Sequence, residues 1–306
     1  MIKTAPDHLT LGEVRSQCQT RTTPLKDNVR DESDDISSGI VEDRLSVDKT
    51  NVLKPFTLMS HRKNYIIIGA HNFQGWDPSR YEEAYDLEDI DVDSTEVQFQ
   101  LSIKAPLAVD LFDKNIDLFM GYTVRSFWQL YNSDNSSPFR ETSHEPELWI
   151  QARPDWKILG LKNTVNAIGI NHMSNGLGGS LSRSWNRVYA AFAFEHGNFA
   201  FMLRPWIRIE EGVEDDDNPD ITDYYGHGDL WLGYKYNKHT FSLMTRNNLE
   251  SGFSRGAVEL GWSFPLFKYP YLKGYLQYFS GYGESLIDYD RYVNTIGVGL
   301  LFTDIL

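Results

Sequence analysis

The feature that most constrains the fold of this chain is a two-residue alternation of apolar and polar side chains. Between residues 97 and 107 the odd positions are mostly apolar: Val97, Phe99, Leu101, Ile103, Ala105 and Leu107. The even positions of the same segment are Gln98, Gln100, Ser102, Lys104 and Pro106. Because successive side chains of a strand point to opposite faces, this alternation predicts a strand with one apolar and one polar face.

About a dozen such segments follow one another, most of roughly ten residues, the length that a tilted strand needs to cross a membrane. They begin near Tyr65, Val97, Ile116, Glu147, Val165, Ser184, Phe199, Gly228, Phe241, Ala257, Tyr271 and Tyr292. Short turns such as Asn237-Lys238 alternate with long polar loops around residues 130–144, 175–183, 210–227 and 281–290. Short turns on one rim and long loops on the other are typical of outer-membrane barrels. Residues 56–306 are therefore predicted to form an all-β, twelve-stranded antiparallel transmembrane β-barrel.

A soluble sandwich or lipocalin-like barrel is the alternative fold, because its strands also alternate. The second face of such a sheet meets water and should be rich in Lys and Glu. Here that face carries Gly, Ala, Thr, Gln and aromatic side chains, which favours a membrane barrel. No stretch approaches about 18 consecutive apolar residues, so the sequence excludes a transmembrane helix.

Residues 1–55 have a different character from the rest of the chain. No aromatic residue precedes Phe56, and charged residues, Ser and Thr occur without periodicity, as in RDESDDISSG. This composition predicts a polar, mobile N-terminal extension. The 306-residue chain carries 43 acidic and 29 basic residues, a net charge of -14, which argues against nucleic-acid binding through a basic face.

Three polar residues share the face predicted to meet lipid. In the segment 165–174, VNAIGINHMS, both His172 and Ser174 have the parity of Ile168, and Asn186 has the outward parity of the next strand. Polar groups against lipid are costly and therefore suggest function. A serine nucleophile needs a base, and the base needs a third group to fix its tautomer. Taken singly, each residue also fits an ordinary rim, packing or turn position, so alternation alone leaves both interpretations open.

The run NHMSNGLGGSLSRSWNRVY, residues 171–189, resembles the outer membrane phospholipase A family, which shows His-x-Ser-Asn-Gly followed by Ser-Arg-Ser-Trp-Asn-Arg. Further matches are SSPFRET at 136–142, DDNPDIT at 216–222 and SGYGESLIDY at 280–289. The resemblance covers residues 56–306. It implies a barrel in the outer membrane of a Gram-negative bacterium, with its active site on the outer face at the outer leaflet. The implied activity is calcium-dependent cleavage of acyl esters of phospholipids and lysophospholipids, as a phospholipase A1/A2.

The resemblance also implies a role for each residue of the motif. Ser174 is the expected nucleophile, His172 the general base and Asn186 the group that orients it. The backbone amide of Gly176, together with Ca2+ and its water, is expected to stabilise the oxyanion.

Calcium ligands are implied in the same way. Ser182 matches a ligand of the family, and Leu177, which replaces a frequent Arg, is expected to contribute its carbonyl. Ser136 matches a ligand that the partner subunit supplies, which links calcium binding to an active homodimer. Hydroxyl and carbonyl oxygens suit a hard cation. For both serines, turn capping is the structural alternative.

Two departures from the family affect these expectations. Gly179 stands where an acidic residue would aid a second, weaker calcium site, although Asp217 is available for it. Val124 replaces a polar residue that the family can use between subunits, so a weakened dimer is expected.

A passive pore or structural barrel without turnover is the rival function. It predicts conductance across a bilayer and no acyl release. The enzyme interpretation predicts a plugged lumen, filled by the inward-facing Arg125, Trp149, Arg153, Arg187 and Glu259.

Overall fold

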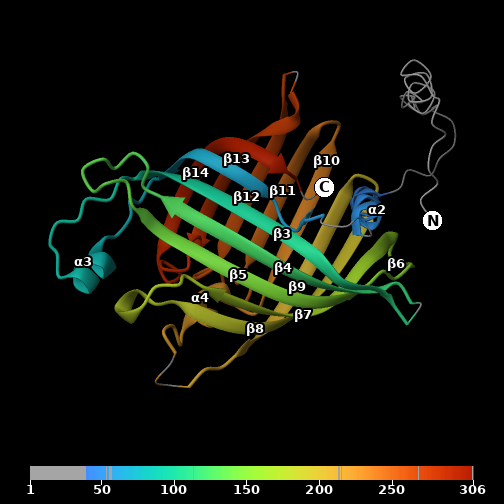
Figure 1. The fold of residues 1–306 in the computed structure, drawn as a ribbon, viewed down its shortest axis with the longest axis horizontal. Coiled ribbons are helices and arrows are strands. Elements are labelled where there is room, and N and C mark those ends of the chain that lie inside the picture. The colour runs from blue at the N-terminus through green and yellow to red at the C-terminus, as the bar shows by residue number, and fades with distance from the viewer. Residues whose placement is uncertain are drawn as a thin grey trace, which may run out of the picture. The chain divides into compact units, whose positions relative to one another are not determined.

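The computed structural model describes residues 39–306 except Leu53, Pro55, Phe56, Asp113, Val213, Asp215, Lys268 and Ile305. Twelve antiparallel strands form a closed barrel (Figure 1). They are β2 (Asn64–Asn72), β3 (Thr95–Leu111), β4 (Ile116–Trp128), β5 (Phe139–Ala152), β7 (Leu161–Ser174), β8 (Ser184–His196), β9 (Phe199–Ile209), β10 (Gly228–Tyr236), β11 (His239–Arg246), β12 (Ala257–Leu266), β13 (Tyr269–Tyr282) and β14 (Tyr292–Thr303). The ring closes because β14 pairs with β2, and β3 pairs with both β2 and β4. The predicted twelve-stranded barrel is confirmed.

The polarity of the two faces is that of a membrane barrel. On β7 the side chains of Ile168 and Ile170 are 56% and 52% exposed. The next residue, Asn171, is only 4% exposed and faces the lumen. A wall that is apolar outside and polar inside needs lipid rather than water around it. No helix in the part of the chain that the structure describes is long and apolar enough to cross a membrane.

The connections divide between the two rims as predicted. One rim carries the long loops 73–94, 129–138, 175–183, 210–227, 247–256 and 283–291. The opposite rim carries the shorter connections 112–115, 153–160, 197–198, 237–238 and 267–268. The long loops contain the helices α3 (Ser79–Tyr85) and α4 (Ile221–Tyr225) and the 3-10 turn η1 (Gly179–Leu181). All four predicted long loops therefore lie on one rim.

Strand β5 begins at Phe139, earlier than the predicted start near Glu147. After Phe139 the added residues are mostly polar on both faces, since Ser143 and Glu145 are buried in the lumen and His144 lies between them on the outer face. Without an apolar side the segment shows no alternation of hydropathy, so its sequence predicts a loop instead of a strand. Two short strands were also not predicted: β1 (Met59–Ser60) pairs with β3, and β6 (Trp156–Ile158) pairs with β7.

Helix α2 (Ile40–Val52) lies within the segment that the sequence assigned to the polar extension. The backbone N–H of Val41 donates to Glu195 Oε2 at 2.7 Å, which caps the helix at its positive end. Arg44 donates to the carbonyl of Asp304 at 2.8 Å. Figure 1 shows α2 beside the C-terminal end of the chain. Residues 40–52 therefore form a helix where the sequence predicts a polar extension. The sequence does not reveal this helix because its contacts are polar and it has no apolar stripe. Residues 1–38 lie outside the described residues.

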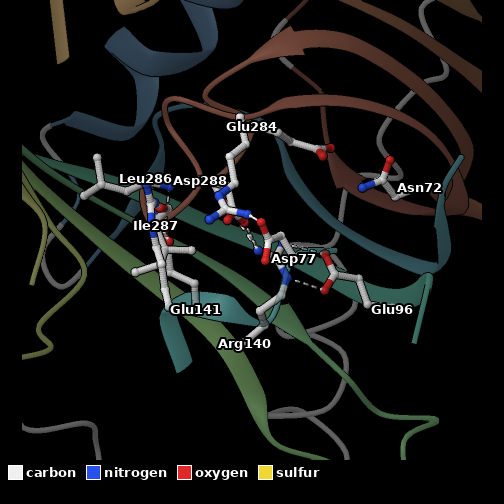
Figure 2. A network of polar contacts seen from close by, with 12 residues as sticks. Asn72, Asp77, Glu96, Arg140, Glu141, Glu284, Leu286, Ile287 and Asp288 are labelled. Carbon is white, nitrogen blue, oxygen red and sulfur yellow. Dashed lines mark hydrogen bonds and ion pairs between the residues drawn. The ribbon is translucent and has the colours of Figure 1, made fainter. Parts of the chain in front are cut away.

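The loop 283–291 folds into the lumen at the long-loop rim, where Arg140 of β5 binds it. The Arg140 guanidinium contacts Glu96, with Nε 2.9 Å from Oε2, and Asp288 of the loop. The neighbouring Glu141 carboxylate accepts hydrogen bonds from two consecutive backbone amides of the loop. Figure 2 shows this network with the loop and β5 side by side. The loop covers this end of the lumen from inside.

Between α2 and the loop 283–291 the lumen holds a cavity of about 410 Å³, lined by charged and polar side chains together with aromatic and aliphatic ones. Four of the predicted lumen residues line it: Arg125, Trp149, Arg187 and Glu259. The fifth, Arg153, forms an ion pair with Asp117 at 2.5 Å. Four of the five side chains therefore face the lumen as predicted, but they line a cavity there rather than fill it.

Candidate active site

His172 and Asn186 face each other across the β7–β8 pair. They are direct register partners, and His172 Nδ1 lies 2.8 Å from Asn186 Oδ1. The His172 side chain is exposed on the same face as Ile170, the face that meets lipid. The structure thus brings together two of the three residues that the sequence placed on one outward face.

Ser174 is the last residue of β7 and lies two positions beyond His172, on the same face. Its Oγ accepts a hydrogen bond from the backbone N–H of Gly176 at 3.1 Å. Gly176 has a φ of 68°, a left-handed conformation that favours glycine. This tight turn directs the amide of Gly176 back toward the serine oxygen, where an oxyanion donor is needed.

Asn175 fixes the conformation of the loop that follows Ser174. Its buried side chain donates from Nδ2 to the Leu181 carbonyl at 2.8 Å. Its Oδ1 accepts from the backbone amides of Leu177 at 3.2 Å and Arg183 at 3.1 Å. The side chain of one residue therefore closes the loop 175–183 on itself.

The inner face of the same strands carries a charged network. Arg187 donates from Nε to Asn171 Oδ1 at 2.8 Å and from Nη2 to Glu145 Oε1 at 2.7 Å. Asn171 directly precedes His172, and Arg187 directly follows Asn186. The inward contacts of Asn171 and Arg187 therefore hold the backbone next to both outward-facing site residues. Because a slip of one residue would turn every side chain to the other face, this network helps to fix the register of the site.

Ser182 and Asp217 meet beside the loop. The Ser182 hydroxyl donates to Asp217 Oδ2 at 2.5 Å, and Leu177 lies in the same loop 175–183. Within the described part of the chain, no group of three or more His, Cys, Asp or Glu side chains could hold a metal ion. A cation here would depend on hydroxyl, carbonyl and single carboxylate oxygens, a donor set that suits Ca2+.

Ser136 belongs to a different loop, between β4 and β5. It is exposed in the loop 129–138 with a φ of 60°, and its backbone N–H donates to the Ser133 carbonyl at 3.2 Å. Among the described hydrogen bonds, none joins Ser136 to Ser182 or to Asp217.

Two features of the site escaped the sequence analysis. His144 is the register partner of Ser174, and its Nδ1 lies 2.6 Å from the hydroxyl of Tyr122 on β4. His144 is also the register partner of Val124, a residue of the outer face. Had the sequence shown that β5 begins before residue 144, this pairing would have placed His144 on the outer face. The second feature is Glu211, just beyond β9, whose Oε1 accepts from Asn186 Nδ2 at 2.5 Å.

Comparisons with known proteins show to which family the chain belongs. A family model described as phospholipase A1 matches residues 41–302. The phospholipase A1 of Klebsiella pneumoniae is 38% identical over 254 residues, 82% of this chain and 84% of that protein. The structure of outer membrane phospholipase A from Escherichia coli is 37% identical and covers 82% of this chain and 100% of its own, with a TM-score of 0.74.

A third similar structure is the Salmonella typhi outer membrane phospholipase dimer with bound calcium. It is 37% identical, covers 84% of this chain and 97% of its own, and has a TM-score of 0.75. The family match extends through the barrel and into α2, and the similarity in fold accompanies substantial sequence identity. The chain therefore belongs to the phospholipase A1 family.

Proposed function

We propose that this outer-membrane barrel hydrolyses acyl ester bonds of phospholipids and lysophospholipids at either acyl position, with calcium, through Ser174, His172 and Asn186. The observation that carries the proposal is the contact between His172 Nδ1 and Asn186 Oδ1 at 2.8 Å, beside Ser174 on the lipid-facing surface. Acyl esters reach this surface from the membrane itself. A neutral Asn orients the base without placing a bare carboxylate directly against lipid.

The three side chains divide the reaction between them. Asn186 Oδ1 accepts the Nδ1 proton of His172, which leaves the Nε2 lone pair free to take the proton of Ser174. Ser174 Oγ then attacks the ester carbonyl, and the Gly176 amide donates to the oxyanion that forms. His172 returns the proton to the leaving alcohol, and the acyl-enzyme forms. Water, deprotonated by the same base, then releases the fatty acid.

The calcium proposal rests on the chemistry of the donors. Ser182 donates to Asp217, and Leu177 follows Gly176 directly in the loop 175–183, so the loop and its partner offer hydroxyl, carbonyl and carboxylate oxygens. A calcium ion bound there supplies positive charge that stabilises a developing oxyanion. The related Salmonella typhi structure has bound calcium, which supports the proposal of a calcium site.

Activation by dimerisation is the role proposed for Ser136. This serine lies in the loop 129–138 and makes no described hydrogen bond to Ser182 or Asp217, so we expect it to complete that site from a second copy of the chain. The dimeric state of the Salmonella relative supports this arrangement. The monomer would then be inactive, and Val124, beside His144 on the outer face, would lie near the subunit boundary with a weaker polar contribution to the dimer.

The first test is fatty-acid release from phospholipid in detergent micelles, with calcium and then with a chelator. We expect release that requires calcium and that is lost in Ser174→Ala. A folded, crosslinked dimer that releases fatty acid at the wild-type rate after Ser174→Ala would refute the proposed nucleophile.

Planar-bilayer conductance tests the rival pore function on the same sample. With α2 near one rim and the loop 283–291 in the lumen at the other, we expect no steady conductance. Steady conductance without acyl release would favour the pore.

A further inference from the structure

The hydrogen bonds of the site continue beyond Asn186 to a carboxylate. Asn186 Oδ1 faces His172 Nδ1 at 2.8 Å, and Asn186 Nδ2 donates to Glu211 Oε1 at 2.5 Å. Glu211 lies two residues past Ile209, the register partner of Asn186 on β9. The backbone pairing of β8 with β9 thus brings Glu211 to the far side of Asn186 from the imidazole.

The two ends of a side-chain amide have opposite roles. The oxygen only accepts hydrogen bonds and the nitrogen only donates them, whereas a carboxylate only accepts. Glu211 can therefore bind only the Nδ2 end of Asn186, and this forces Oδ1 toward His172. In the reverse orientation the amide nitrogen would face the imidazole, and the tautomer with the proton on Nε2 would be favoured. That tautomer could not take the proton of Ser174.

Glu211 has no competing ion-pair partner among the described residues. In the same loop, by contrast, Asp216 pairs with Arg208 at 2.6 Å. The Glu211 carboxylate is half-buried, and Asn186 is the residue that uses it. Its negative charge lies one amide away from His172, where it would also favour the imidazolium that forms during the reaction.

We propose that Glu211 is a positioning residue of the hydrolase: it orients the Asn186 amide and thereby selects the His172 tautomer with a basic Nε2. This inference rests on the proposed Ser174, His172 and Asn186 site and adds a fourth group to it. Glu211 does not touch the substrate, so its removal should lower kcat and leave KM unchanged.

The first experiment compares Glu211→Ala with Glu211→Gln, each with and without Asn186→Ala, in micelles at saturating calcium. We expect Glu211→Ala to lower kcat by about 10- to 100-fold, the usual effect of losing a group that orients a site residue. Glu211→Gln should restore most of kcat, since its amide oxygen still accepts from Asn186 Nδ2. In the Asn186→Ala background, Glu211→Ala should cause no further loss, because the two residues act as a unit.

The second experiment reverses the donor and acceptor of this hydrogen bond. Asn186→Asp alone places two carboxylates against each other and should impair turnover. Adding Glu211→Gln supplies an amide N–H to the new carboxylate, so the kcat of the double variant should exceed that of Asn186→Asp by about tenfold or more. A role limited to loop stability predicts no such rescue.

Glu210→Ala, at the exposed neighbouring position, is the matched control and should behave like the wild type.

The outcomes separate this inference from the proposed function. Full activity of Glu211→Ala beside an impaired Asn186→Ala would overturn the role of Glu211 and leave the three-residue site standing. An equal loss from Glu211→Ala in both backgrounds, or no rescue in the reversed pair, would also overturn it. Full activity of Ser174→Ala and Asn186→Ala would instead refute the site itself. If Glu211→Ala does not fold, the reversed pair alone decides.

Discussion

His144 and Ser174 are direct register partners on the outer face of β5 and β7. The imidazole of His144 packs over the Gly176 turn: a Cβ atom at Gly176 would lie 3.8 Å from His144 Cδ2. Its other side meets Tyr122, with Nδ1 2.6 Å from the hydroxyl. The proposed nucleophile is therefore flanked by an imidazole on the neighbouring strand as well as by His172 on its own.

This packing predicts that the ring of His144 matters more than its nitrogens. His144→Ala should lower kcat by about tenfold, because the turn that carries the Gly176 amide loses its cover and small displacements of such groups are costly. His144→Phe keeps the ring and should retain most of the activity. Initial rates of fatty-acid release check both variants. An equally large loss in His144→Phe would show that the hydrogen bond to Tyr122 is what counts.

Ser182 and Asp217 predict a calcium-specific defect. Removing the hydroxyl in Ser182→Ala should raise the calcium concentration needed for half-maximal activity by about tenfold, because Ca2+ requires several oxygen ligands. Excess calcium should restore kcat. A calcium titration of fatty-acid release measures this, with Ser180→Ala, an exposed serine of the same loop, as control. An unchanged calcium requirement in Ser182→Ala would place the metal elsewhere.

The parts of the fold that sequence could predict are those whose outer face is apolar. Ile168 and Ile170 mark the lipid side of β7, and their parity alone sets His172 and Ser174 outward. The first half of β5 and the helix α2 carry no such periodicity, since their partners are lumen charges such as Glu195. The roles of the site residues came from the resemblance of the motif to a known family.

The sequence could not predict long-range contacts made by loop residues, for a different reason. Asn186 and Glu211 are 25 positions apart, and their contact depends on where β9 ends and how its loop turns back. Only the register of β8 on β9, with Asn186 opposite Ile209, makes the approach visible. Alternation determines which face a residue occupies, but it does not determine this register.

The lumen network around Arg140 predicts a large loss of stability. Arg140 is buried between Glu96 and Asp288, so Arg140→Met would leave two buried carboxylates without their cation. Breaking a buried ion pair in this way costs about 3–5 kcal/mol in the free energy of unfolding. Urea unfolding of the barrel in micelles, followed by tryptophan fluorescence, measures the change.

Arg255→Ala is the matched control for that measurement. Arg255 pairs with Asp223 at 2.8 Å, but the two side chains are 46% and 57% exposed. An exposed pair of this kind contributes about 0–1 kcal/mol, so the control should unfold almost as the wild type does. Equal effects of the two substitutions would contradict a structural role for the buried network.

Glu284 in the loop 283–291 predicts how stability depends on pH. Burial raises the pKa of the Glu284 carboxyl from 4.5 to about 7, although Arg125 lies 3.7 Å away and opposes the shift. Its Oε1 accepts from Thr295 at 2.8 Å, and its Oε2 has no hydrogen-bond partner among the described residues. The folded barrel therefore favours the protonated carboxyl.

The sign of the effect follows from comparing the two states. Between pH 4.5 and 7 the unfolded chain releases the Glu284 proton and the folded barrel keeps it. The stability that this group contributes is thus full below pH 4.5 and is lost as the pH rises through about 7. The difference amounts to at most about 3.4 kcal/mol, from 1.36 kcal/mol for each pKa unit. Glu284→Gln stays neutral, so urea unfolding at pH 5 and pH 8 should show a smaller decrease in stability for this variant than for the wild type. The same decrease in both proteins would mean that Glu284 does not titrate in this range.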